Sequence, residues 1–206
     1  MFELLADSTP NARKISIMLE EIQKPYDVKM IDISKGDQHN NEFKKISPFS
    51  KIPVLKNLVS KETYFESGAI LIYLANLSDQ FYGNNKDLTN QWLMAQMAYV
   101  GPMLGQHHQF HHYHPGKSDF GERRYFSIAK NIYETLNDHL SHYEFLAGEY
   151  SIADIATFPW IARHPIHDIG LNLYPHLARW YNLIKTRPAV MKGYDLFNDN
   201  TQPPEV

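Results

Sequence analysis

The sequence contains no cysteine among its 206 residues. This absence excludes disulfide bridges and cysteine-ligated metal sites within the chain. Any thiol or disulfide chemistry would therefore have to use a sulfur atom that a ligand brings. An excess of charge of one sign is also missing, because 20 Lys and Arg residues nearly balance 23 Asp and Glu residues and the formal net charge is only −3. We therefore expect no nucleic acid or other polyanion as a partner.

Long hydrophobic runs are missing as well. No stretch approaches the roughly 20 apolar residues that a membrane-spanning helix requires. The first residues, Met1–Leu5, lack the basic start and the extended apolar segment of a secretory signal. We therefore expect a soluble, cytoplasmic protein that does not associate with a membrane.

One stretch in the first half of the chain combines a strand pattern with a proline. Ser50–Leu55 reads SKIPVL, so Pro53 lies among apolar residues that favour strands. A proline cannot donate to a sheet ladder, and the position therefore suits an edge, a bulge or a cis peptide bond. If the bond before Pro53 is cis, the backbone N–H and C=O of Ile52 can pair with an extended ligand.

A second stretch, Tyr64–Ala75, reads as a short strand that runs into a helix. Ser67 is a typical N-cap residue. The apolar residues that follow have helical spacing: Ile70, Leu71 and Leu74. The N-terminus of such a helix attracts a carboxylate, while Glu66 can hold an ammonium group. Together with Ile52, these features suit a short peptide that carries an α-amine and an α-carboxylate.

Residues 1–78 show the order strand, helix, strand, followed by two strands and a helix. The strands are expected at residues 2–6, 26–33, 54–55 and 63–65. The first strand-helix-strand crossover implies a parallel pair, and the later hairpin adds an antiparallel pair. Residues 79–87 are polar and contain Gly83-Asn84-Asn85, which predicts a linker.

The rest of the chain, residues 88–206, predicts an all-helical domain. Its main helices are expected at residues 92–104, 121–143, 174–186 and 188–195. Gly101-Pro102 should bend or interrupt the first of them. Ser151 and Asp154 have the spacing of a capping box at the start of an apolar helix.

The arrangement of Ile52-Pro53 followed by Phe65–Ile70 resembles the glutathione-binding half of the glutathione transferases. In that family the proline follows a cis bond, the preceding residue pairs with the cysteinyl backbone, and a Glu/Gln-Ser pair holds the γ-glutamyl end. The resemblance covers nearly the whole chain. It implies an α/β N-terminal thioredoxin-like domain over residues 1–78, a linker over 79–87 and an all-α C-terminal domain over 88–206, which is the glutathione transferase architecture.

Further motifs resemble the nu-class subgroup, whose members act on disulfides with glutathione. These motifs are Thr9-Pro10-Asn11, Gly36-Asp37-Gln38, Ile46-Ser47-Pro48, Lys51-Ile52-Pro53 and Leu104-Gly105-Gln106. The segment from Ser151 to Ala156 is shared with much of the superfamily and is less specific. The implied cosubstrate is glutathione, reduced or oxidised, and we expect no metal.

A glutathione enzyme must form a thiolate from a thiol whose free pKa is about 8.5. Most classes use a Tyr, Ser or Cys near the end of the first strand, but Tyr and Cys are absent between Met1 and Gln23. Thr9 can donate its hydroxyl to the sulfur and the Asn11 amide can donate N–H bonds, which makes them the expected catalytic residues. Alternatively, Ser8 contacts the sulfur, or the three residues only form a turn and a helix cap.

The remaining glutathione contacts are expected in both domains. The full set comprises Asn11, Gln38, Lys51, Ile52, Pro53, Glu66, Ser67 and Arg124. Gln38 and Lys51 would meet the glycyl end, or else are solvated side chains. Glu66 and Ser67 would hold the γ-glutamyl end, or else form an ordinary helix cap. Arg124 would approach a second glutathionyl unit, or else forms a surface pair with Arg123.

Histidines crowd residues 107–114. They are His107, His108, His111, His112 and His114. The pairs His107/His111 and His108/His112 have the i,i+4 spacing with which one helix face can chelate a metal. The nu-class resemblance implies instead a polar, histidine-bearing wall of the active-site cleft, with Phe110 and Tyr113 packed inward. We favour this second interpretation.

The resulting prediction is a glutathione-dependent disulfide-bond oxidoreductase in which the thiolate of bound glutathione replaces a protein cysteine. One alternative is a glutathione transferase that conjugates glutathione to electrophiles, because both reactions need the same thiolate. Another is a non-catalytic regulatory or interaction protein that keeps the fold. The predicted partners are glutathione and a small or peptide disulfide or electrophile, and the resemblance implies a homodimer.

Overall fold

A computed structural model describes all residues from Met1 to Val206. The chain forms two compact units. Unit 1 contains Met1–Tyr82 together with Arg187–Gln202, and unit 2 contains Gly83–Thr186 together with Pro203–Val206. The segment predicted as a linker, residues 79–87, therefore contains the junction between the two units.

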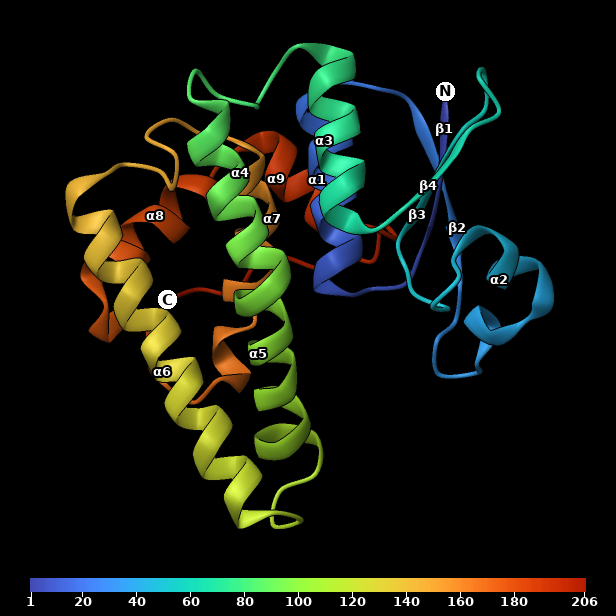
Figure 1. Ribbon diagram of the computed structural model, residues 1–206. Helices are drawn as coiled ribbons and strands as arrows, with labels where there is room; N and C mark the ends of the chain where they lie inside the picture. Colours follow the sequence, from blue (N-terminus) through green and yellow to red (C-terminus); the bar gives the residue numbers. More distant parts are fainter. The chain divides into compact units, whose positions relative to one another are not determined.

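Unit 1 is built on a four-stranded mixed sheet (Figure 1). The strands are β1 (Phe2–Ala6), β2 (Tyr26–Met30), β3 (Val54–Asn57) and β4 (Thr63–Phe65), in the spatial order β2-β1-β3-β4. β1 and β2 are parallel because helix α1 (Pro10–Glu21) connects them as a crossover. β3 pairs antiparallel with both β1 and β4. The predicted thioredoxin-like order is confirmed.

Between β2 and β3 the chain forms a turn and two short helices. β2 ends before the predicted limit at Ile33, because the carboxylate of Asp32 accepts two backbone N–H bonds from the residues that follow and starts a turn. The 3₁₀ helix η1 (Asp37–His39) and helix α2 (Asn41–Ile46) come next. This segment leads into the loop before β3.

Helices cover both faces of the sheet. Figure 1 shows α1 and α3 (Ser67–Ser78) on one side of the strands and α2 on the other. Successive residues of β1 point to opposite faces, so Leu4 and Leu5 enter two different cores. On the side of α2, Leu5 packs with Ile31, Phe43 and Val54. The buried residues on the side of α1 and α3 include Leu4, Ile15, Met18, Leu55, Ile70, Leu71 and Leu74.

Helix α9 (Pro188–Tyr194) belongs to unit 1. Its close approach to α1 depends on Gly193, where an added Cβ would lie 2.5 Å from the Cα of Ile17. The hydroxyl of Ser16 donates to the carbonyl of Gly193 at 2.5 Å. The prediction of one helical domain over residues 88–206 therefore differs from the observed packing here. The sequence of a single helix does not say which unit buries it.

Unit 2 begins with a continuous helical run. It comprises α4 (Lys86–Ala95), the π-helical η2 (Gln96–Val100), α5 (Gly101–His107) and the π-helical η3 (His108–Tyr113). The run is not interrupted at Gly101-Pro102, where the sequence predicted a bend or a break. Pro102 has no N–H to donate, and the wider turn of η2 directly before it changes the hydrogen-bond register within the helix.

Unit 2 contains three further α-helices and two short 3₁₀ helices. They are α6 (Asp119–His142), α7 (Ile152–Ile161), α8 (Pro175–Lys185) and the short 3₁₀ helices η4 (His164–Ile166) and η5 (Leu171–Leu173). Nearly every residue of α7 is buried. The predicted capping box of Ser151 and Asp154 is confirmed at its start. No helix of the structure is both long enough and apolar enough to cross a membrane.

Candidate active site

The loop before β3 contains a cis peptide bond between Ile52 and Pro53, as predicted. The hydroxyl of Ser47 accepts from the N–H of Lys51 at 3.0 Å and donates to the carbonyl of Lys51 at 2.7 Å, which holds the loop in shape. The paired residues of β3 begin at Val54. Ile52 therefore lies just outside the sheet ladder, where its backbone can align with an extended peptide.

The N-terminus of α3 follows directly on β4, whose last residue, Phe65, pairs with Val54 of β3. Glu66 is the N-cap, with φ 67° and ψ 114°, and no side chain caps the helix. The prediction that Ser67 is the N-cap is therefore wrong, because the left-handed φ of Glu66 makes Ser67 the first helical residue. Glu66 is exposed, whereas Ser67 is only 6% exposed. A helix start without a capping side chain can accept a carboxylate.

A buried lysine, Lys14 of α1, meets this helix start. Its Nζ donates to Oγ of Ser67 at 3.4 Å, and only 1% of the residue is exposed. Burial lowers the pKa of Lys14 well below its ordinary value, while the carboxylate of Glu66 acts in the opposite direction. Sequence reasoning missed Lys14. A signal was present, because Lys14 stands four residues before the buried Met18 and thus on the same helix face.

The residues predicted to stabilise a thiolate lie at the start of α1. Thr9 is the N-cap, and its Oγ1 accepts from the N–H of Ala12 at 3.4 Å, so the cap role is present. A hydroxyl that accepts in this way still has its own hydrogen to donate. Asn11 is half-buried in the first turn, and Ser8 accepts from Nη2 of Arg13 at 2.8 Å. Thr9 and Asn11 thus share the positive end of α1.

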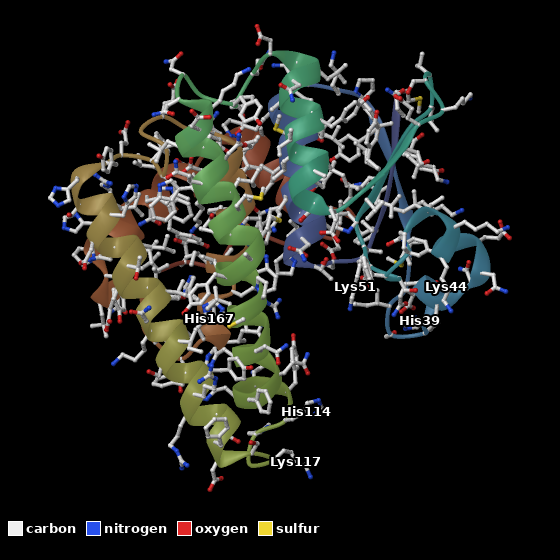
Figure 2. The ribbon with its side chains drawn as sticks, in the orientation of Figure 1. His39, Lys44, Lys51, His114, Lys117 and His167 are labelled. Atoms are coloured by element: carbon white, nitrogen blue, oxygen red, sulfur yellow. The ribbon has the colours of Figure 1, made fainter.

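The part of unit 1 that carries η1 and α2 presents nitrogen-bearing side chains. Figure 2 labels three of them, His39, Lys44 and Lys51. Gln38 lies in η1, where its Nε2 is 3.2 Å from Nε2 of His39 and its Oε1 is buried without a hydrogen-bond partner. Lys51 is exposed beside the cis bond. Cationic groups suit a carboxylate, but contact of Gln38 and Lys51 with the glycyl end stays a prediction.

Arg124 lies in unit 2, where it is exposed on α6. It lines an open groove of about 390 Å³ together with Phe120, Arg123, Ser127 and Ile128. Arg123 also lines a second groove of about 660 Å³ on the same helix. The two arginines therefore share one surface. The approach of Arg124 to a second glutathionyl unit stays a prediction.

The histidine tract divides into a buried and an exposed part. His107 and His108 are 0% and 5% exposed, whereas His112 and His114 are exposed. The prediction of a cleft wall is therefore wrong for His107 and His108, and Tyr113, predicted to pack inward, is 50% exposed. The wider turn of η3 changes which side chains face the core, and i,i+4 counting does not anticipate it. No group of three or more His, Asp or Glu side chains is arranged to hold a metal ion.

His108 belongs to a buried hydrogen-bonded chain. The hydroxyl of Tyr133 lies 2.6 Å from Nδ1 of His167, and Nε2 of His167 lies 2.8 Å from Nε2 of His108. His167 is labelled in Figure 2. Burial lowers the pKa of His108 to about 3, helped by the positive charge of Arg163, and burial likewise lowers the pKa of His167. Both rings are therefore neutral parts of the fold at neutral pH.

Two family models match the chain. The model of the glutathione S-transferase N-terminal domain matches residues 9–77, and that of the C-terminal domain matches residues 125–188. The first match contains the cis bond, the start of α3 and the start of α1.

Individual proteins are similar over most of the chain. Disulfide-bond oxidoreductase YfcG of Escherichia coli (strain K12) is 38% identical, with 92% of each chain covered. A glutathione transferase from Burkholderia graminis, solved with two glutathione molecules per subunit, has a TM-score of 0.89 at 34% identity, covering 96% of this chain and 89% of that one. A glutathione transferase from Pseudomonas putida, solved with one glutathione disulfide per subunit, has a TM-score of 0.89 at 35% identity, covering 95% and 91%. The chain belongs to the glutathione transferase family.

Proposed function

We propose that this protein is a glutathione-dependent disulfide-bond oxidoreductase. The observation that carries the proposal is the pairing, within a chain that has no cysteine, of the cis Ile52–Pro53 bond with the uncapped start of α3. The first suits the backbone of an extended peptide and the second suits its carboxylate. Glutathione has both features and also brings the missing thiol. The similarity to YfcG, whose name states disulfide-bond oxidoreductase activity, supports the same reaction here.

In the proposed reaction, the sulfur of bound glutathione acts where other enzymes use a cysteine. Its thiolate attacks one sulfur of a substrate disulfide, forms a mixed disulfide and releases the first substrate thiolate, which takes up a proton. A second glutathione thiolate attacks the glutathionyl sulfur and releases the second substrate thiol. Two glutathione molecules thereby become one glutathione disulfide, and the substrate gains two electrons and two protons. The relatives solved with two glutathione molecules or with glutathione disulfide support such a site.

The thiolate needs hydrogen-bond donors and a positive potential. We assign the donors to the hydroxyl of Thr9 and the amide of Asn11, at the positive end of α1. Neither side chain can act as a base at neutral pH, so the site would lower the thiol pKa instead of removing the proton itself. Ser8 is the alternative donor, although its oxygen already accepts from Arg13.

The rest of the ligand would lie along the loop before β3 and the start of α3. Ile52, shaped by Pro53, would pair with the cysteinyl backbone, and Gln38 and Lys51 would hold the glycyl carboxylate. Glu66 would bind the ammonium of the γ-glutamyl group. Ser67 and the first N–H groups of α3 would bind its α-carboxylate. Arg124 would approach the second glutathione.

The setting of the reaction follows from its chemistry and from the family. We place the protein in the cytoplasm, because the reaction consumes reduced glutathione and the cytosol maintains that pool. We also propose a homodimer, as the family resemblance implies. Light scattering coupled to size-exclusion chromatography tests the dimer, and a mass equal to one chain would contradict it.

The test of the function combines binding with turnover. Calorimetric titration with reduced and oxidised glutathione should show binding of both, and the same sample should reduce hydroxyethyl disulfide. Asn11→Ala should lower turnover by about tenfold or more, because one donor to the sulfur is lost. Asn182→Ala, the same change at an exposed position on α8, should turn over like the unmodified protein.

Each alternative outcome would contradict a different part of the proposal. Turnover of an aromatic halide without reduction of the disulfide would replace the proposal with a conjugating transferase. Binding without any turnover would favour a regulatory protein. Absence of binding of either glutathione form would overturn the proposed ligand. Unchanged turnover in Asn11→Ala would show that the assignment of Asn11 is wrong.

A further inference from the structure

Arg13 joins the last helix of the chain, α9, to the turn before α1. The residue is 4% exposed, and its Nε donates to the carbonyl of Tyr194, the last residue of α9, at 3.0 Å. The guanidinium also covers the ring of Tyr194, with 4.1 Å from Cζ to the ring centroid. Its Nη2 donates to Oγ of Ser8 at 2.8 Å. One side chain therefore bridges the end of α9 and the turn at which the sulfur of glutathione is proposed to lie.

This bridge follows from the direction of helical side chains and from the packing of α1 on α9. Side chains of a helix lean toward its N-terminus, so Arg13, near the start of α1, reaches back to Ser8. The two helices lie side by side (Figure 1), close enough for the hydroxyl of Ser16 to donate to the carbonyl of Gly193. The carboxylate of Asp7 accepts from the N–H of Ser8 at 2.6 Å, so the backbone of Ser8 is held as well.

We propose that Arg13 is a positioning residue for the sulfur site and that it acts through Ser8. Ser8 stands directly before Thr9, so holding its side chain limits the movement of the turn that carries the proposed thiolate donors. Two nitrogens of one planar group are needed, because one meets Tyr194 and the other meets Ser8. The inference rests on the proposed function. It deepens that function by giving α9 a part in stabilising the bound thiolate.

The experiment measures the pKa of the thiol of bound glutathione. S-Methylglutathione has no titrating thiol, and the chain has no cysteine. The difference in ultraviolet absorbance between the complexes with glutathione and with S-methylglutathione therefore reports this thiolate alone. Arg13→Met should raise the pKa of the bound thiol by about 0.5 or more, because the turn loses its anchor on α9. The affinity for S-methylglutathione should change by less than about threefold, because the rest of the ligand is proposed to lie along other elements.

Two further variants test how Arg13 acts. Ser8→Ala removes the other end of the bridge and should also raise the pKa of the bound thiol. Combining it with Arg13→Met should add little to either change alone. Arg13→Lys keeps the charge, but its single nitrogen cannot meet Tyr194 and Ser8 together, so it should behave like Arg13→Met. Ser8→Ala changes an exposed residue and serves as the test if Arg13→Met does not fold, as judged by thermal unfolding.

The matched control is Arg187→Met. Arg187 donates to the carboxylate of Glu21 through Nε at 2.6 Å and Nη2 at 3.0 Å, so it joins α9 to α1 at the opposite end of both helices. Its replacement loosens the same helix pair away from the sulfur site, and the pKa of the bound thiol should stay unchanged. An increase equal to that in Arg13→Met would show that the packing of α9, and not the contact with Ser8, sets this pKa. That result would overturn the inference.

The remaining outcomes separate the inference from the proposed function. An unchanged thiol pKa in Arg13→Met, or recovery of the unmodified value in Arg13→Lys, overturns the inference and leaves the proposed function intact. Additive effects of Ser8→Ala and Arg13→Met do the same, because the two residues would then act independently. Failure of the unmodified protein to bind either glutathione or S-methylglutathione overturns both.

Discussion

The helices α3 and α7 begin in opposite ways. At α7, Ser151 is the N-cap and Asp154 completes a capping box, so the acceptors and the negative charge that a helix start needs lie within the chain. At α3, no side chain caps the helix, no acidic residue occupies the first turn, and Nζ of Lys14 donates to Oγ of the first residue, Ser67. The comparison teaches that side chains of unit 2 cap the start of α7, whereas no side chain caps the start of α3 in unit 1. The uncapped start is the place where a ligand carboxylate is proposed.

Two buried polar clusters of unit 2 are also hydrogen-bonded within the unit. Asp154 is fully buried, and its two oxygens accept from the N–H groups of Leu146 and Ser151 and from Nε1 of Trp180. The chain of Tyr133, His167 and His108 is also buried and hydrogen-bonded within the unit. These polar groups are hydrogen-bonded within the fold, so substituting them should lower the free energy of unfolding. Substituting the first residue of α3 should instead lower the affinity for the ligand.

The largest effect is expected from Asp154→Ala. The substitution leaves several buried donors without an acceptor, each of which costs free energy, so the free energy of unfolding should fall by about 3 kcal/mol or more. Urea denaturation measures this loss. Asp138→Ala, at an exposed position of α6, should change it by about 0.5 kcal/mol or less. A loss below about 1 kcal/mol in Asp154→Ala would mean that α7 does not depend on its built-in cap.

Part of this contrast can be predicted from the sequence. The capping box was predicted from Ser151 and Asp154, which stand three positions apart. The cis bond was predicted from Pro53, a proline within a strand pattern. The strand order of unit 1 follows from short local patterns in the same way. Local spacing failed at Ser67, because the positive φ of Glu66 shifts the helix start by one residue.

The contacts that sequence analysis missed join residues that lie far apart in the sequence. Lys14 meets Ser67, 53 positions later, and His108 meets His167, 59 positions later. Helical periodicity says that a face is buried but not which residues of other elements it will meet. It therefore cannot distinguish a solvated lysine or a cleft histidine from a buried one. The packing of α9 against α1 escaped prediction for the same reason.

The substitution Ser67→Ala, at the start of α3, should affect ligand binding more than the stability of the fold. Affinity for S-methylglutathione should fall by about tenfold, because the α-carboxylate loses one charge-assisted hydrogen bond. The free energy of unfolding should fall by about 2 kcal/mol or less, and by less than in Asp154→Ala, because the buried Nζ of Lys14 loses one acceptor. Calorimetry and urea denaturation of the same sample measure both. Ser78→Ala, at the other end of α3, is the matched control and should keep the affinity.

This result tests the comparison directly. If Ser67→Ala lowers stability as much as Asp154→Ala and leaves the affinity unchanged, the start of α3 serves the stability of the fold, as that of α7 does, and not ligand binding. The proposed distinction between the two helix starts would then be wrong.

The smallest effect concerns pH and the buried histidines of unit 2. Burial lowers the pKa of His108 from 6.5 to about 3, and the groups that face it, His107, His112 and Arg163, act in the same direction. The unfolded chain therefore binds a proton near pH 6.5 that the folded chain still refuses. The stability that neutral His108 contributes is present above pH 6.5 and is lost as the pH falls from there toward about 3.

The test compares the unfolding free energy at pH 7.5 and pH 5.5. Each histidine that is held neutral costs about 1.4 kcal/mol for each pH unit below its unfolded pKa, so His108 should account for about 1 kcal/mol of the decrease. His108→Phe removes this share. It should be less stable than the unmodified protein at pH 7.5, because His167 loses its partner, yet it should lose less stability on acidification. His142→Phe, at an exposed position of α6, should keep the full decrease. An equal decrease in His108→Phe would mean that His108 does not contribute to the pH dependence of stability. The folded chain would then not hold this ring neutral at pH 5.5.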